Sequence, residues 1–319
     1  VSDIEKKLIR LTRSGNFEDD PVRLLRAIRL AVELDFEIEQ ETWNELCKLS
    51  HLIKNEAPER IRDEFVKLIM LQNSPRGFHL MRESKLLHEI LPELDSAYGI
   101  SQSGLHEHDV FEHIILTVKY APTELRSKLT ALLHDIGKPA KRVVLDDGRV
   151  AFYGHDIEST KIAKRFLKWL RFPNDVIEDV ITVIRYHMFS YGFSDKGLRR
   201  FIRRVGPERM PILIKLRFAD SMAQHEGKTL RDEQEFEKRV YAELTRKPPL
   251  TVRDLDINGY DIMDKFSLKP GPIIGRILKY LLSFVLDNPE MNKKQILIEK
   301  AKEYIEKVDS KERVEGSKR

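Results

Sequence analysis

The sequence has a single cysteine, Cys47, among its 319 residues. Disulfide bonds therefore cannot hold this fold together, and the reducing cytoplasm is the expected compartment. Long apolar runs are also missing, since none approaches the roughly 20 residues that a membrane-spanning helix needs. The first residues show no signal peptide. We therefore expect a cytoplasmic protein that has no membrane partner.

Strand patterns are scarce, and helical periodicity dominates the chain. Apolar residues recur at helical spacing over 21–36, 41–53, 57–71, 74–95, 108–120, 124–136, 155–170, 174–188, 195–204, 207–224 and 229–245. The one clear strand pattern covers 142–153, where two β-branched runs flank Asp147 and Gly148, a typical hairpin turn. These patterns predict an all-α, mainly helical protein with one short β-hairpin.

A strong charge of one sign is absent as well. The chain has 56 basic and 52 acidic residues, a net charge of +4 and a sequence pI of about 8.9. This balance permits an acidic partner such as RNA but does not require one. Because 41% of the residues are apolar, the chain can bury a sizeable core. Its length suggests more than one domain, and we place boundaries near 95 and between 225 and 250.

Histidine and aspartate residues stand at the ends of several expected helices. The set is His113, His134, Asp135, His155, His187 and Asp220. Each one alone fits a helix cap or a packed polar residue, but together they can surround one or two divalent cations. Imidazole suits zinc, nickel, manganese or iron, and carboxylates suit harder ions such as magnesium and manganese. Two ions could activate a water molecule and neutralise a phosphoryl oxygen.

The order of these residues resembles the HD-domain superfamily of metal-dependent phosphohydrolases. The stretch "HDIGKP" (134–139) is a frequent form of its central motif, and His113 and Asp220 stand on either side of it in the sequence. The resemblance implies a divalent metal (magnesium, manganese, nickel or zinc) and makes His134, Asp135 and Lys138 the candidate catalytic residues. It also implies hydrolysis of 2′,3′-cyclic phosphates or of phosphate ends of nucleotides or RNA.

Most of the chain resembles a narrower group, the bacterial tRNA CCA-adding enzymes and poly(A) polymerases. The resemblance rests on "EDDPVRLLRAIRLAVELDFEIEQET" (18–42), "PERIRDEFVKLIM" (58–70) and "DLDINGYDIMDKFSLKPGPIIGRILKYLL" (254–282). It implies an elongated molecule with four parts. These are a remnant of a head domain (1–17), a helical neck with a nucleotide template (18–95), an HD metal-binding domain (96–225) and a helical tRNA-binding tail (226–319).

In that family, an Asp and an Arg of the neck read the Watson–Crick edge of the incoming CTP or ATP. By position these are Asp20 and Arg23, and Arg26 continues the same spacing toward the phosphates. A carboxylate accepts a hydrogen bond from an exocyclic amino group, and a guanidinium donates two in a fixed fork. The alternative is that Asp20 caps a helix and forms an i,i+3 ion pair with Arg23.

The polymerising chemistry of the family resides in an N-terminal head with a Gly-Ser loop and an Asp-x-Asp pair. Only about 17 residues precede the neck here, and they contain neither motif. We therefore expect nucleotidyl transfer to need a head that is supplied in cis or in trans.

Two basic segments are the expected RNA contacts. Residues 196–210 carry Arg199, Arg200, Arg203 and Arg204, and "KPGPIIGRI" (269–277) carries Lys269, Gly271 and Arg276 at a helix start. Backbone N–H groups at such a start bind phosphate, and arginines pair with the RNA backbone. The alternatives are a merely solvated basic face, or a tRNA-binding scaffold whose HD residues are a relic or a structural metal site.

Overall fold

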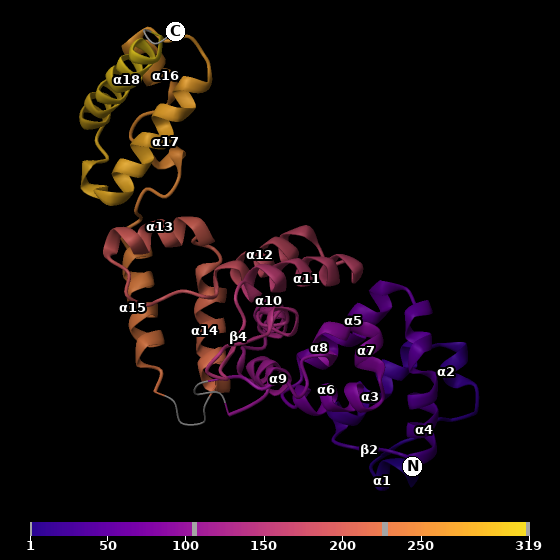
Figure 1. Ribbon diagram of the computed structural model, residues 1–319. Coiled ribbons are helices and arrows are strands. Elements are labelled where there is room, and N and C mark those ends of the chain that lie inside the picture. The colour runs from indigo at the N-terminus through magenta and orange to yellow at the C-terminus, as the bar shows by residue number, and fades with distance from the viewer. Residues whose placement is uncertain (1, 104–106, 225–228, 317–319) are drawn as a thin grey trace. The chain divides into compact units, whose positions relative to one another are not determined.

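The computed structural model describes residues 2–103, 107–224 and 229–316, and most of them are helical (Figure 1). Within these ranges the structure has four strands of two residues each, and they form two pairs. The expectation of a mainly helical protein with a short β-hairpin is therefore confirmed. No helix in the described ranges has both the length and the apolar character needed to cross a membrane.

The chain forms two compact units, and each unit combines two stretches of sequence. Unit 1 comprises residues 1–189 and 211–233, and unit 2 comprises residues 190–210 and 234–319. The division into head remnant, neck, HD domain and tail stays a prediction.

The first part of unit 1 consists of short helices around one helix that is buried along one face. Its elements are α1 (Ser2–Glu5), β1 (Leu8–Ile9), α2 (Asn16–Asp19), α3 (Val22–Leu34), β2 (Glu37–Ile38), α4 (Gln40–Leu49), η1 (Ser50–Asn55), α5 (Pro58–Ile69), α6 (Ser74–Glu83), α7 (Leu86–Ile90) and α8 (Pro92–Asp95). Helix α3 packs on α5 and α6 through its apolar stripe. It ends at Asp35, whose φ of 53° is left-handed, a conformation that short Asp side chains tolerate.

The range 74–95, where helical periodicity runs without a break in the sequence, contains three separate helices in the structure. Helix α6 ends at Ser84, and Lys85 then adopts a left-handed φ of 66° that stops the helical ladder. Pro92 forces a second break: it lacks a backbone N–H and keeps Leu91 out of the helical region.

The two strand pairs differ in how the sequence signals them. Strands β3 (Val143–Val144) and β4 (Val150–Ala151) pair antiparallel across the predicted Asp147-Gly148 turn. Strands β1 and β2 pair parallel, with Leu8 opposite Glu37. The sequence did not indicate this second pair, because two residues are too few for a period-two pattern.

The rest of unit 1 contains five helices, one of which is buried along most of its length. They are α9 (Val110–Tyr120), α10 (Leu125–Leu133), α11 (His155–Trp169), α12 (Asn174–Tyr186) and α14 (Met210–Gln224), with the turn η2 (Pro139–Lys141) after α10. Helix α10 is buried along most of its length and packs on α9, α11 and α12. The residues that directly follow α10 therefore lie in the interior of unit 1.

Unit 2 is built on one apolar helix, α17 (Pro272–Asp287), which packs against α13 (Asp195–Val205), α16 (Gly259–Phe266) and α18 (Lys294–Gly316). The unit also contains most of α15 (Arg231–Thr245) and the turns η3 (Val252–Asp254) and η4 (Pro289–Met291). Pro272 occupies the first position of α17, where its missing N–H costs nothing.

Candidate functional site

The structure brings all six predicted metal ligands together inside unit 1. His113 lies on α9, His134 and Asp135 directly follow α10, His155 begins α11, His187 directly follows α12, and Asp220 lies on α14. All six side chains are buried. The sequence places a polar residue at each of these helix positions, and the packing around α10 makes them converge.

Asp135 is the centre of this cluster. Its Oδ2 atom lies 3.2 Å from His134 Nε2 and 3.4 Å from His113 Nε2, and its Oδ1 atom lies 3.1 Å from His155 Nε2 and 3.5 Å from His187 Nε2. The ligand atoms thus form two triads that share Asp135, each with all its atoms within 4.8 Å of one another. One carboxylate is therefore placed to bridge two cations.

Asp220 extends the first triad. Its Oδ1 atom lies 3.1 Å from His113 Nε2 and 3.8 Å from His134 Nε2. Arg217 lies 2.9 Å from its Oδ2 atom and Gln224 donates to its Oδ1 atom at 3.2 Å. These contacts orient the carboxylate of Asp220 toward the first triad, as outer partners of metal ligands do.

Three of the histidines have their protonation set by the backbone. The Nδ1 atoms of His134, His155 and His187 lie 2.8, 2.8 and 2.6 Å from the carbonyl oxygens of Ala131, Phe152 and Ile184. Because a carbonyl only accepts, Nδ1 must carry a proton, and Nε2 is the ring nitrogen that is left to face a ligand.

The Nε2 atoms of His134, His155 and His187 are the strongest indication of a ligand. They are buried, and no described residue makes a hydrogen bond of acceptable geometry with them. Buried polar atoms without partners are rare and costly, so such atoms call for an ion or water. Imidazole nitrogens converging on carboxylates fit a transition-metal ion such as zinc, manganese, nickel or iron, and the donor set does not choose among these.

The electrostatics of the cluster favour ionised carboxylates. Burial opposes ionisation of Asp135, but its interactions with His134, Lys138 and His113 outweigh burial and keep the pKa of that carboxyl well below its usual range. The pKa of Asp220 is lowered in the same way: burial raises it, and the contact with His113 outweighs burial. Both aspartates therefore offer negative charge to a cation at neutral pH.

The pKa values of His134 and His113 shift in opposite directions. Burial lowers the pKa of His134, so this imidazole is neutral and ready to bind a metal. Burial also disfavours the charged form of His113, but its contacts with Asp135 and Asp220 prevail and raise its pKa to about 9. In the metal-free protein His113 thus carries a proton, which must leave when an ion binds.

A cleft opens beside the cluster. Its lining includes Asp135, Lys138, Phe152, Tyr153, His155, His187, Met188, Arg217, Asp220 and Gln224. The Nζ atom of Lys138 lies 2.6 Å from Asp135 Oδ2 and 2.6 Å from Gln102 Oε1. Two cationic side chains, Lys138 and Arg217, therefore stand next to the cluster, where they can pair with phosphate oxygens.

Sequence reasoning identified Lys138 but missed Arg217 and Gln102. Arg217 precedes Asp220 by three positions on one helix, so its i,i+3 spacing was a usable signal. Gln102 is 36 positions from Lys138, and no local pattern points to it.

The predicted nucleotide template also comes together, within unit 1. Arg23 Nε lies 3.3 Å from Asp20 Oδ2, and Arg60 Nη2 lies 2.8 Å from Asp20 Oδ1. Pro21, not Asp20, is the N-cap of α3, and no side chain caps this helix end, so only the ion-pair half of the alternative is observed. Arg26 contacts Glu64 Oε1 at 3.2 Å, which holds it to a buried carboxylate.

The predicted RNA contacts separate into different surroundings in unit 2. Arg200, Arg203 and Arg204 line one cleft together with Ser283 and Leu286. Lys269, Gly271 and Arg276 are exposed near the start of α17. Leu286 is 14 residues beyond Pro272, about 21 Å along this helix at 1.5 Å per residue. Lys269 and Gly271 therefore lie at the other end of α17 from the cleft, whereas Arg276 precedes the cleft residue Ser283 by only seven residues.

Arg199 is placed differently from the other arginines of α13. Its side chain is buried, its Nε atom donates to the carbonyl of Leu286 at 2.6 Å, and its Nη2 atom donates to that of Asp287 at 3.2 Å. The guanidinium thus caps the C-terminus of α17, where a positive charge is favourable. This inward position argues against the predicted phosphate contact.

Comparisons with known proteins indicate the family of this chain. Residues 35–98 match the family described as "Probable RNA and SrmB-binding site of polymerase A", and residues 155–301 match "tRNA nucleotidyltransferase domain 2". A CC-adding tRNA nucleotidyltransferase of Thermus thermophilus is 33% identical over 88% of the chain. An A-adding tRNA nucleotidyltransferase of Deinococcus radiodurans is 30% identical, also over 88% of the chain.

The matches cover only part of these relatives, since the chain spans 66% of the length of the first and 67% of the second. Among solved structures, the Bacillus stearothermophilus CCA-adding enzyme in complex with CTP superimposes with a TM-score of 0.67. That match covers 97% of this chain and 68% of the enzyme at 17% identity, so it shows a shared fold.

Proposed function

Because the chain belongs to the tRNA nucleotidyltransferase family of CCA-adding enzymes and poly(A) polymerases, we propose that it selects nucleotides and holds tRNA for addition at the 3′ end. The observation that carries this proposal is the pairing of Asp20 with Arg23, 3.3 Å apart at the start of α3. CC addition, A addition and complete CCA addition all fit this role.

The chemistry of the pair explains selection of C and A. Cytosine and adenine present an amino group where uracil and guanine present a carbonyl oxygen. The Asp20 carboxylate accepts from an amino group but repels a carbonyl, and the Arg23 guanidinium donates to the neighbouring ring nitrogen. Arg60 holds the other carboxylate oxygen of Asp20 and so orients the acceptor. Transfer itself is assigned to a head domain, in cis or in trans.

Nucleotide titration tests this template. We expect the chain to bind CTP and ATP more tightly than UTP and GTP in calorimetry, and Asp20→Ala and Arg23→Ala to remove the difference. Arg13→Ala, which removes an exposed arginine of the same segment, is the control. Equal affinity for all four nucleotides in the unsubstituted chain would reject the template.

The tRNA contact is assigned to the cleft formed by Arg200, Arg203 and Arg204. Each phosphate contact to a duplex contributes about 0.9 to the slope of log K against log salt. The double variant Arg203→Ala/Arg204→Ala should therefore weaken tRNA binding and reduce that slope by about 1.8. Lys238→Ala/Lys265→Ala, which removes two exposed cations from other helices of unit 2, should leave the slope unchanged.

The buried cluster favours a second function, metal-dependent hydrolysis of phosphate esters, which is the chemistry of HD domains. Its support is the set of buried Nε2 atoms of His134, His155 and His187, which converge on Asp135. Bound ions would supply a nucleophilic hydroxide and charge neutralisation. Lys138 and Arg217 would hold the phosphate oxygens, and Gln102 would fix the position of Lys138.

Assays of 2′,3′-cyclic nucleotide and RNA 3′-phosphate hydrolysis test this function. Metal content is measured on the same samples. His134→Ala and Asp135→Ala should lose both metal and turnover, and His88→Ala, an exposed histidine, should keep both. Turnover in a chelated, metal-free sample would reject the metal-dependent reaction. Metal binding without turnover on any ester would favour a structural metal in a tRNA-binding scaffold.

A further inference from the structure

The outer face of α11 is an unusually basic surface that the metal cluster does not use. Residues 159–171 contain five cationic residues and no acidic one. The five are Lys161, Lys164, Arg165, Lys168 and Arg171, and all of them are exposed. Trp169 lies among them with 36% of its surface exposed. His155, by contrast, begins the same helix and is buried in the cluster.

Acidic neighbours neutralise part of this face. Lys161 pairs with Glu158 at 3.2 Å, Arg171 pairs with Glu59 at 2.5 Å, and Arg165 pairs with Glu93. Lys164 and Lys168 have no ion pair in the described part of the chain. They are four positions apart, so they lie on one side of the helix. Lys168 is the sequence neighbour of Trp169, so these two uncompensated charges lie on the side of α11 next to the groove and outside its lining.

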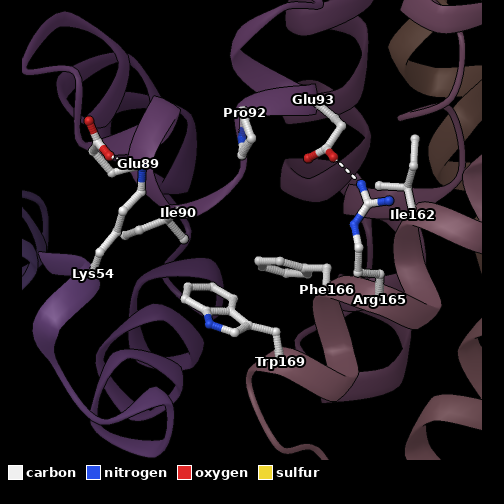
Figure 2. A pocket seen from close by; sticks show the side chains of 9 residues that line it. All are labelled: Lys54, Glu89, Ile90, Pro92, Glu93, Ile162, Arg165, Phe166 and Trp169. Atoms are coloured by element: carbon white, nitrogen blue, oxygen red, sulfur yellow. Dashed lines mark hydrogen bonds and ion pairs between the residues drawn. The ribbon is translucent and has the colours of Figure 1, made fainter. Parts of the chain in front are cut away.

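An apolar groove of about 390 Å³ lies next to Trp169, between α11 and the α7–α8 segment (Figure 2). Ile90, Pro92, Ile162, Phe166 and Trp169 form its apolar lining. In Figure 2 the rings of Phe166 and Trp169 border the open space between the two segments.

Two ion pairs form the rim of the groove, and their cations are the exposed partners. In the pair of Lys54 with Glu89 the side chains are 59% and 16% exposed, and in the pair of Arg165 with Glu93 they are 66% and 27% exposed. An approaching ligand therefore meets positive charge around an apolar, aromatic centre. Such a surface is complementary to a ligand with a flat apolar part and negative charges beside it.

We infer that this surface, formed by Lys164, Lys168, Trp169 and the groove, binds an unpaired segment of RNA. A base would stack on Trp169, and the phosphates would pair with the exposed cations, which is how proteins hold single strands. A duplex hides its bases and would leave the indole unused. Favourable placement of cations at a helix C-terminus accounts for Lys168 and Arg171 but not for an exposed indole beside a groove.

This inference rests on the proposed RNA-binding role and adds a contact in unit 1 that is independent of the arginine cleft in unit 2. Fluorescence provides a direct measurement, because the chain has only two tryptophans. In a Trp43→Phe background, Trp169 is the sole indole. A 12-nucleotide poly(A) RNA should quench its emission, and a blunt RNA duplex of 12 base pairs should not.

Affinity measurements on the full chain complete the test. Trp169→Ala should weaken binding of the 12-mer about tenfold, and Trp169→Phe should retain most of the affinity because it keeps an aromatic face. Lys164→Ala/Lys168→Ala should lower the salt slope by about 1.4. The control Lys48→Ala/Lys119→Ala removes two exposed cations from other helices of unit 1.

Two results would overturn the inference. The first is a 12-mer affinity and salt slope in the α11 variants equal to those of the control, which would leave the groove to an acidic protein partner. The second is equal quenching by single strand and duplex. The tail variant Arg203→Ala/Arg204→Ala separates the two proposals. If it loses tRNA binding while the α11 variants keep their RNA affinity, only the present inference fails.

Discussion

The backbone N–H of Gly137 donates a hydrogen bond to Ser159 Oγ at 2.9 Å, which joins the turn after α10 to the second turn of α11. A β-carbon at position 137 would lie 2.5 Å from the backbone nitrogen of Ser159 and 2.7 Å from the carbonyl oxygen of His155. Glycine is therefore required for this close approach. The approach is what brings Asp135 to within 3.1 Å of His155.

Gly137→Ala should consequently disturb both stability and the metal cluster. We expect a loss of roughly 1–3 kcal/mol in the free energy of unfolding, because rigid backbone has to move to admit the methyl group. Denaturant unfolding and metal analysis would measure the two effects. Gly275→Ala is the matched control: its β-carbon meets nothing within 4 Å, so this helical substitution should stabilise the protein by roughly 0.5–1 kcal/mol. A Gly137→Ala protein of unchanged stability would contradict the packing argument.

Metal stoichiometry should reveal the shared carboxylate. We expect two ions for each chain and almost none in Asp135→Ala, because both triads contain this residue. His187→Ala should retain about one ion, since it breaks only the second triad. Elemental mass spectrometry on dialysed protein gives these numbers. A His187→Ala chain without any ion, or an Asp135→Ala chain with one, would show that the sites are not joined through Asp135.

The raised pKa of His113 predicts a pH dependence of the metal-free protein. Its pKa is 6.5 in the unfolded chain and about 9 in the folded one, so its contribution to stability is complete below pH 6.5 and is lost as the pH rises through 9. A shift of this size corresponds to about 3 kcal/mol. Melting temperatures of chelated protein between pH 6 and 10 would show the loss.

Asp220→Asn is the control for that titration. It removes one of the two charges that hold the proton on His113, so the drop in stability between pH 6.5 and 9 should shrink. The stability of metal-loaded protein should instead increase as the pH rises. Ions and protons compete for the same nitrogen, so metal binds more tightly at higher pH. An identical pH profile in chelated Asp220→Asn and unsubstituted protein would contradict this account.

Two arginines of α13 should behave differently from each other. Arg199→Ala should destabilise unit 2 by about 2–4 kcal/mol, because it leaves the buried carboxylate of Glu243 and the last carbonyls of α17 with fewer donors. Arg203→Ala lies in the open cleft and should change stability by less than about 0.5 kcal/mol while weakening tRNA binding. Thermal unfolding and filter binding distinguish the two outcomes, and equal effects on stability would contradict the assignment.

Local patterns in the sequence predict much of this fold. Helices such as α3, α5 and α12 follow the apolar periodicity, and the β3–β4 hairpin follows its Asp147-Gly148 turn. The break at Lys85 escaped the same method, because an apolar stripe continues across it and a left-handed residue leaves no mark in hydropathy. The parallel contact of Leu8 with Glu37 also escaped, since it joins segments that share no local pattern.

The candidate sites also combine features that local sequence patterns predict with features that depend on contacts between distant segments. The sequence by itself determined which residues carry chemistry: polar ligands at the ends of apolar helices, a carboxylate and an arginine three positions apart, and arginine-rich segments. Only the tertiary structure decided how they act. It divides the histidines between the two oxygens of Asp135, turns Arg199 inward, and sets Trp169 beside Ile90 in a groove. Residue type and spacing are local properties, whereas burial and contact depend on which distant helices pack together.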